Sequence, residues 1–206
     1  MRFRMITISR EFGSGGRTIG KAIAAALGYA YYDNELVTQI AQKSGFSEKY
    51  IKESGEYAGN TSGLLFDFNN FGTGSYTTNS DYLYVVQRNL IQELANQGPC
   101  VIVGRCADYI LRERCDCLHV FIHANMDFRE ERIVRLYGEL EEASAKKRIQ
   151  KKDKQRATYY KYYTNRKWGV AQNYHMCLDS SVLGIENCVN MITQVVRKSE
   201  GKEINE

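Results

Sequence analysis

The stretch from Ile6 to Lys21 constrains this chain more than any other, because it combines an apolar strand, a glycine-rich turn and the start of a helix. Glycine lets a backbone curl so that successive N–H groups point at an anion, and a helix that begins at such a turn adds the positive end of its dipole. The stretch therefore predicts a phosphate-binding loop over Gly13, Ser14, Gly15 and Gly16. A plain strand-to-helix turn is the alternative.

The loop departs from the common pattern G-x-x-x-x-G-K-[ST] at two positions. In the best register Glu11 replaces the first glycine, and Gly16-Arg17-Thr18 stands where Gly-Lys-Thr is usual. Arg17 thus takes the place of the lysine. Because arginine is planar and always charged, it can grip two phosphate oxygens at once, although it is bulkier. Lys21, one helical turn later, is the second candidate for the same role.

The composition indicates one soluble globular domain over residues 1–206, with 43% hydrophobic and 25% charged residues. No run of about eighteen apolar residues is present that could span a membrane, and the first residues pass directly into a strand instead of a signal peptide. We therefore expect no membrane partner and a cytoplasmic location, where the six cysteines stay reduced. A net charge of +4 is too small to indicate nucleic-acid binding by itself.

Apolar runs alternate along the chain with segments of helical spacing. Strands are expected at 3–9, 29–32, 100–103, 117–122 and 174–178, and helices at 18–27, 34–43, 47–56, 81–97 and 185–196, with a further helix that carries Arg129, Arg132 and Arg135. This order predicts an α/β fold: a mainly parallel sheet of about five strands, covered by helices on both faces. Ligands of such folds bind at the carboxyl ends of the strands.

Two segments interrupt this alternation. Residues 57–79 are rich in Gly, Asn, Ser and Thr, which is typical of a mobile binding loop or partner surface, or else of an insertion with no role. Between Lys146 and Lys167 lie ten basic residues and one acidic residue, Asp153, interleaved with tyrosines. A solvated helix face and an RNA-binding surface are alternatives, but a basic lid over the strand ends, at about 139–167, fits better.

With these pieces in order, the chain resembles the P-loop nucleoside monophosphate kinases, and most of all the bacterial cytidylate kinase-like family. The resemblance is carried by Ile6–Lys21, Tyr31-Tyr32-Asp33, Val101–Arg105, Arg129–Arg135, Arg148 with Asp153 and Arg156, and Cys177–Ser181. It implies a three-layer α/β/α P-loop NTPase fold with a helical lid, and ATP and Mg²⁺ as cofactors.

The resemblance also implies roles around the nucleotide. The backbone of Gly13–Gly16 would cradle the β-phosphate of ATP, and Arg17 would neutralise the transferring phosphate. The Thr18 hydroxyl would help to hold phosphate or Mg²⁺. Asp33 would bind Mg²⁺ through water or orient the acceptor; capping the helix that follows it is the alternative.

On the acceptor side, Arg105 and Arg88 are candidates for the α-phosphate, because an anion near a strand end needs a fork-shaped donor. Asp108 is a further substrate-side candidate. The lid residues Arg148, Asp153 and Arg156 would close over both phosphates and exclude water.

Relatives with cytidylate kinase chemistry carry a loop lysine, and Gly-Arg-Asp where this chain has Gly104-Arg105-Cys106. We expect ATP-dependent transfer of the γ-phosphate to a nucleoside monophosphate, with CMP as one candidate, or to a similar small phosphoacceptor. The alternatives are an acceptor that is not a nucleotide and a degenerate P-loop protein that senses nucleotide without efficient turnover. Nucleic-acid binding is a minor option, and the aromatic content of 57–79 suggests a homodimer.

Overall fold

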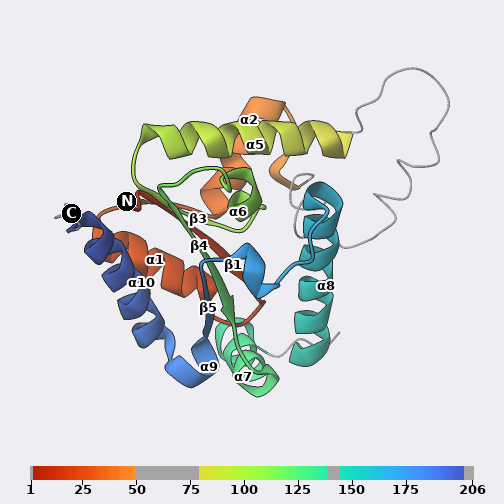
Figure 1. Ribbon diagram of the computed structural model, residues 1–206. Helices are drawn as coiled ribbons and strands as arrows, with labels where there is room; N and C mark the ends of the chain where they lie inside the picture. The colour runs from red at the N-terminus through yellow and green to blue at the C-terminus, as the bar shows by residue number, and fades with distance from the viewer. Residues whose placement is uncertain (1, 50–78, 139–143, 202–206) are drawn as a thin grey trace.

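Five parallel strands form the central sheet of the computed structural model, which describes residues 2–49, 79–138 and 144–201 (Figure 1). The strands are β1 (Met5–Arg10), β2 (Ala30–Tyr32), β3 (Cys100–Val103), β4 (Cys117–His123) and β5 (Met176–Asp179). Their spatial order is β2-β3-β1-β4-β5, so β1 lies at the centre. Ile8 of β1 is in register with Val103 of β3 and with Val120 of β4.

The inner strands are buried on both faces, which explains their nearly continuous apolar sequences. Every residue of β1 and β3 is buried, and in β4 only the last residue, His123, is partly exposed. Parallel strands need helical crossovers, and the carboxyl ends of the strands consequently share one edge of the sheet.

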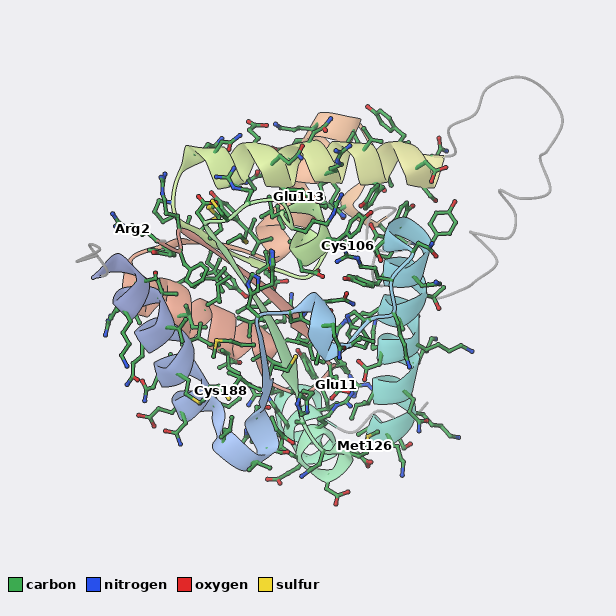
Figure 2. All side chains as sticks on the ribbon, in the orientation of Figure 1. Arg2, Glu11, Cys106, Glu113, Met126 and Cys188 are labelled. Carbon is green, nitrogen blue, oxygen red and sulfur yellow. The ribbon has the colours of Figure 1, made fainter. Side chains whose placement is uncertain are left out.

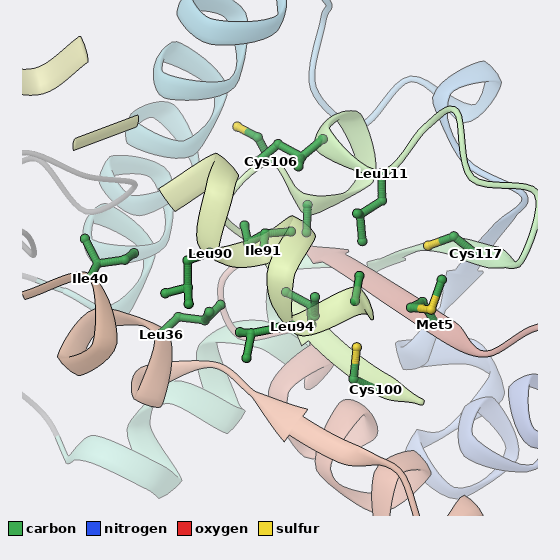
Figure 3. Packing of buried hydrophobic residues seen from close by; sticks show 14 of the residues in the cluster. Met5, Leu36, Ile40, Leu90, Ile91, Leu94, Cys100, Cys106, Leu111 and Cys117 are labelled. Carbon is green, nitrogen blue, oxygen red and sulfur yellow. The ribbon is translucent and has the colours of Figure 1, made fainter. Parts of the chain in front are cut away.

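Helices cover both faces of the sheet. They are α1 (Gly16–Leu27), α2 (Asn34–Ser44), α5 (Asn79–Gln97), α6 (Ala107–Ile110), α7 (Met126–Tyr137), α8 (Ala145–Thr164), α9 (Ser180–Leu183) and α10 (Ile185–Glu200), with a short 3₁₀ helix, η1 (Ala171–Asn173). On one face α1 and α10 pack together through Ile19, Ile23 and Ile192. On the other face Leu36 of α2 and Leu90 of α5 lie in the same cluster of buried side chains as Met5 and Cys117 (Figure 3).

Local sequence signals mark several helix ends. Gly28 ends α1 with a φ of 68°, a left-handed conformation that glycine adopts without steric penalty. The side chain of Asn125 accepts a hydrogen bond of 2.9 Å from the backbone N–H of Phe128 at the start of α7. Asp179 does the same for Ser181, also at 2.9 Å, at the start of α9. Such caps fix where each helix begins relative to the strand before it.

The parallel sheet with helices on both faces confirms the fold expected from the sequence. The expected helix at 47–56 lies mostly outside the described residues, as does nearly all of the segment 57–79. The expected basic lid at 139–167 corresponds to α8 over its described part. Within the described residues, no helix has the length and apolar character needed to cross a membrane.

Candidate active site

The glycine-rich loop joins the carboxyl end of β1 to α1, at the edge of the sheet where ligands of parallel α/β folds bind. Gly13 and Gly15 have φ values of 89° and 84°, which L side chains rarely adopt. A Cβ atom on Gly13 would lie 3.0 Å from both Cβ and the carbonyl oxygen of Arg129, and one on Gly16 would lie 2.5 Å from Cβ of Arg10. Both the conformation and the packing of the loop therefore require glycine.

Side chains of neighbouring elements hold the loop in place. The Ser14 hydroxyl lies 2.9 Å from the carbonyl oxygen of Glu11 and 3.1 Å from that of Ile122. The Ser180 hydroxyl donates to the carbonyl oxygen of Ser14 at 2.6 Å. Glu11 in turn accepts a hydrogen bond of 3.1 Å from the backbone N–H of Ala124. The side chain of Ser14 is thus fully buried in the loop's own support, and its backbone is the part that can face a ligand.

The first turn of α1 is well suited to an anion. Helix N-termini leave N–H groups without intrahelical partners and carry the positive end of the dipole. In the described part of the chain no side chain caps α1, whose preceding residue is Gly15, and its first turn contains no acidic residue. An uncapped helix N-terminus behind a glycine loop is an arrangement of the type that binds phosphate groups in proteins.

Arg17, the residue at the lysine position, contacts a carboxylate at this edge of the sheet. Its Nε donates to Oδ2 of Asp33 at 2.5 Å, and the Tyr31 hydroxyl donates to its backbone oxygen at 3.3 Å. Asp33 directly follows β2 and occupies the N-cap position of α2, but its side chain does not cap that helix within the described structure. The structure thus brings Arg17 and Asp33 together as an ion pair, with the Arg17 side chain 40% exposed.

Two arginines of α7 reach the loop from the opposite side. Arg132 donates to the Thr18 hydroxyl at 2.7 Å, and burial together with nearby Arg135 lowers its pKa from the usual value. Arg129 donates to the carbonyl oxygen of Phe12 at 2.8 Å and forms an ion pair of 3.1 Å with Glu11. Arg132 therefore supplies a buried positive charge beside the helix N-terminus, while Arg129 is used to hold the loop.

Helix α8, which packs against α7, is tied to the same loop. Asp153 accepts a hydrogen bond of 2.8 Å from the backbone N–H of Phe12 and pairs with Arg129. Arg156 donates to the carbonyl oxygen of Arg10 at 2.9 Å. Figure 2 shows Glu11 in the region between the strands and α8. Asp153 therefore contacts the loop backbone and an arginine, which couples the position of α8 to that of the loop.

The third predicted lid residue, Arg148, lies at the start of α8 beside the end of α7. Its Nη1 donates to the carbonyl oxygen of Gly138 at 3.4 Å, and its guanidinium lies 5.9 Å from the centre of the Tyr137 ring. The Tyr137 ring stacks on that of Phe12 at 6.3 Å between centroids. Within the described residues, Arg148 thus reaches the loop through the aromatic rings of Tyr137 and Phe12.

The turn after β3 carries one of the predicted substrate-side residues, Arg105, in a strained backbone. Gly104, Arg105 and Cys106 have successive φ values of 76°, 60° and 55°, and left-handed conformations in two consecutive non-glycine residues are costly. Arg105 is buried, and its backbone oxygen accepts from Nε2 of Gln87 at 2.9 Å. Arg88, by contrast, is exposed on α5. Strain of this kind is typical of positions that are held for function.

Asp108, at the start of α6, is the most perturbed carboxyl group of the site. Burial raises its pKa to about 6, against the lowering effect of hydrogen bonds from Tyr160 and Ser9. The Tyr160 hydroxyl donates to it at 2.7 Å, and that of Ser9 at 3.4 Å. Asp108 links β1, α6 and α8 beneath the site, and its side chain is buried.

The sequence analysis did not include Arg10, Arg129 and Arg132 among the site residues. All three are at most 9% exposed, which is unusual for arginine. The sequence does contain a signal that arginines gather on one face of the helix after β4. Every third position there is an arginine, at Arg129, Arg132 and Arg135. Which member of that face turns toward the loop depends on how α7 docks, and the spacing does not reveal it.

No curated protein matches the sequence significantly. Among solved structures, an uncharacterized protein from Eubacterium ventriosum ATCC 27560 is 25% identical with a TM-score of 0.70, covering 94% of this chain and 98% of that one.

Two kinases share the fold at lower identity. Shikimate kinase from Acinetobacter baumannii in complex with shikimate is 14% identical, with a TM-score of 0.54 and coverage of 98% and 96% of the two chains. A gluconokinase from Sinorhizobium meliloti 1021 is 13% identical, with a TM-score of 0.52 and coverage of 99% and 100%. A family model described as "Cytidylate kinase-like family" matches residues 5–182. The chain therefore belongs to the cytidylate kinase-like family and has the fold of the P-loop kinases.

Proposed function

We propose that the chain is an ATP-dependent kinase that transfers the γ-phosphate to a nucleoside monophosphate or a similar small phosphoacceptor. The observation that carries the proposal is the uncapped N-terminus of α1 behind the glycine loop, with buried arginines of α7 and α8 gathered beside it. Phosphoryl transfer needs positioning and positive charge more than a protein nucleophile, and this arrangement supplies both.

On the nucleotide side, the amides from Gly13 to Gly16 bind the β-phosphate, aided by the dipole of α1. We assign the charge next to the transferring phosphate to Arg132 as well as to Arg17. Arg132 is buried and contacts Thr18 at 2.7 Å, so it is fixed before a ligand arrives. A charge that is oriented in advance stabilises a transition state without the cost of reorganisation.

The residues present fit a magnesium ion that a nucleotide carries in. Mg²⁺ keeps several waters and needs only one or two protein oxygens besides phosphate, and the Asp33 carboxylate and the Thr18 hydroxyl at the loop edge are of the suitable type. When bound, the ion neutralises phosphate charge. Asp33 would then share its carboxylate between the metal and Arg17, and Thr18 would keep its contact with Arg132.

Helix α8 acts as the lid in this proposal. Asp153 and Arg156 hold its middle against the loop, so that water is kept away from the phosphates. Arg105, whose backbone is strained, and Arg88 and Arg148, whose side chains are more exposed, bind the acceptor phosphate. An exposed arginine can turn toward an arriving anion at little cost in free energy.

A second candidate function is nucleotide sensing without efficient turnover. It is favoured by one observation: Arg17 stands at the lysine position and is paired with Asp33 at 2.5 Å. If this pair persists with ATP bound, the loop binds phosphate but lacks the mobile cation that follows the transferring group.

A coupled assay of ADP release separates the two functions. Wild-type protein with ATP and Mg²⁺ is supplied in turn with each common nucleoside monophosphate and with small hydroxyl compounds. The kinase proposal predicts saturable turnover with a nucleoside monophosphate. ATP binding by calorimetry together with no turnover above the acceptor-free rate for any acceptor would favour the sensor.

Arginine variants test the assigned roles in the same assay. Arg132→Gln should lower kcat by roughly 10²-fold, the scale for loss of one preorganised donor, while Arg197→Gln on α10 removes the same charge far from the loop and should leave kcat unchanged. Equal kcat values for Arg132→Gln and wild type would remove Arg132 from the site. Unchanged turnover in Arg17→Ala would likewise remove Arg17 and make Lys21 the better candidate.

A further inference from the structure

A polar cavity lies away from the glycine loop. It has a volume of about 230 Å³ and is walled by residues after α6, by β4 and by the segment that joins α8 to β5. Because a water molecule occupies about 30 Å³ in the liquid, the cavity has room for about seven waters, or for one small organic molecule. His119, in its wall, lies four residues before the end of β4 and so roughly 13 Å from the edge that carries the loop.

The wall of the cavity carries more positive than negative charge. Arg112 and Arg166 contribute two guanidinium groups, which lie 4.1 Å and 5.2 Å from the centre of the Tyr109 ring. The single acidic residue in the wall, Glu113, has a side chain that is 83% exposed and pairs with Arg112 at 3.1 Å. An anion entering the cavity would therefore meet cationic groups that an aromatic ring holds in place.

Two stacked histidines, His119 and His175, also line the cavity, with their ring centroids 4.9 Å apart. Nδ1 of His175 accepts a hydrogen bond of 3.0 Å from the backbone N–H of His119. In a neutral ring the proton of His175 must then reside on Nε2, which is a donor.

His119 itself is 4% exposed, and its Nδ1 is 2.7 Å from the Thr7 hydroxyl. Its Nε2 is buried and has no hydrogen-bond partner among the residues that the structure describes. Buried polar atoms normally have a hydrogen-bond partner, so this nitrogen is available to bind one. The cavity borders this ring.

We propose that this cavity is a second binding site, which takes a small anion carrying a phosphate or carboxylate group. Arg112 and Arg166 provide the charge, and the two histidine rings provide further polar groups in the wall. The ligand would contact the segment between α8 and β5 without touching the glycine loop. The proposal does not depend on the kinase activity.

The chain's three histidines allow a test with an internal control, because His119 and His175 line the cavity and His123 ends β4 next to Asp179. Imidazole NMR signals, assigned with histidine-to-glutamine variants, are followed while inorganic phosphate is added to the full chain at constant ionic strength. Acetate is titrated separately as the carboxylate probe. We expect saturable shifts of the His175 and His119 signals with at least one probe.

Two variants with equal loss of charge sharpen the test. Arg166→Gln should raise the Kd measured at His175 by about tenfold, which corresponds to ~1.4 kcal/mol. Arg197→Gln, on the opposite face of the sheet, should leave this Kd unchanged. Shifts confined to His123 would overturn the second site while supporting phosphate binding near the loop. Absence of saturable shifts, or equal Kd values in the two variants, would also overturn it.

Discussion

Two buried groups in the fold should make opposite contributions to the pH dependence of this protein's stability. Burial raises the pKa of Asp108 from 3.8 to about 6, and burial together with His175 lowers the pKa of His119 from 6.5 to about 4. In both residues the fold favours the neutral form. One is an acid and the other a base, so their effects on stability run in opposite directions over the same pH range.

The sign of each effect follows from which state binds more protons. Asp108 contributes stability that is fully present below pH 4 and is lost as the pH rises through about 6. His119 contributes stability that is present above pH 6.5 and is lost as the pH falls toward 4. At about 1.4 kcal/mol per pKa unit, each effect amounts to about 3 kcal/mol. In the wild-type protein the two contributions should nearly cancel.

Single variants separate the two effects. Asp108→Asn leaves only the His119 contribution, so its free energy of unfolding should rise by about 3 kcal/mol, relative to the wild-type profile, from pH 4 to pH 7. His119→Gln should show the opposite slope. Urea unfolding at four pH values measures these slopes, which do not depend on the constant loss of stability that either substitution causes. Profiles of Asp108→Asn and wild type that run parallel would refute the reasoning for Asp108.

Two further predictions concern the loop and its support. In Gly13→Ala a φ of 89° is combined with a Cβ 3.0 Å from a neighbouring backbone oxygen, so the free energy of unfolding should fall by about 2–4 kcal/mol. In Gly28→Ala the φ is 68° but the space around the new Cβ is open, so the free energy of unfolding should fall by about 1 kcal/mol. Equal losses of stability in urea unfolding would contradict the packing argument. Asp153→Asn breaks the ion pair with Arg129 and should lower the free energy of unfolding by about 2 kcal/mol. Glu93→Gln breaks an exposed ion pair with Lys43 and should lower it by less than about 0.5 kcal/mol. A smaller loss in Asp153→Asn than in Glu93→Gln would show that Asp153 does not tie α8 to the loop.

The sheet was predictable because its strands have clear local signals. β3 is a fully apolar run between Pro99 and Gly104, and β1 is closed by a glycine turn. The short helices α6 and α9 were not predicted, because a helix of four residues shows no periodicity. Asp179 caps α9 through its carboxylate, a contact that the sequence pattern did not predict.

The sequence predicts where on the fold the candidate site lies, but it does not predict which side chains contact one another there. The loop and Asp33 both follow strands, so the topology brings them to one edge. That Arg17 pairs with Asp33, and that Asp153 accepts from the backbone of Phe12, depends on how separate helices dock. Sequence pattern gives the charge of such side chains but not the partner that each one selects.

The most direct test of the kinase proposal follows the phosphate itself. Protein is incubated with γ-labelled ATP, Mg²⁺ and nucleoside monophosphates, CMP included, and the labelled products are separated. The proposal predicts label on a nucleoside diphosphate, with transfer lost in Arg132→Gln and kept in Arg197→Gln. Label that stays on ATP, or that appears only as inorganic phosphate, would contradict it.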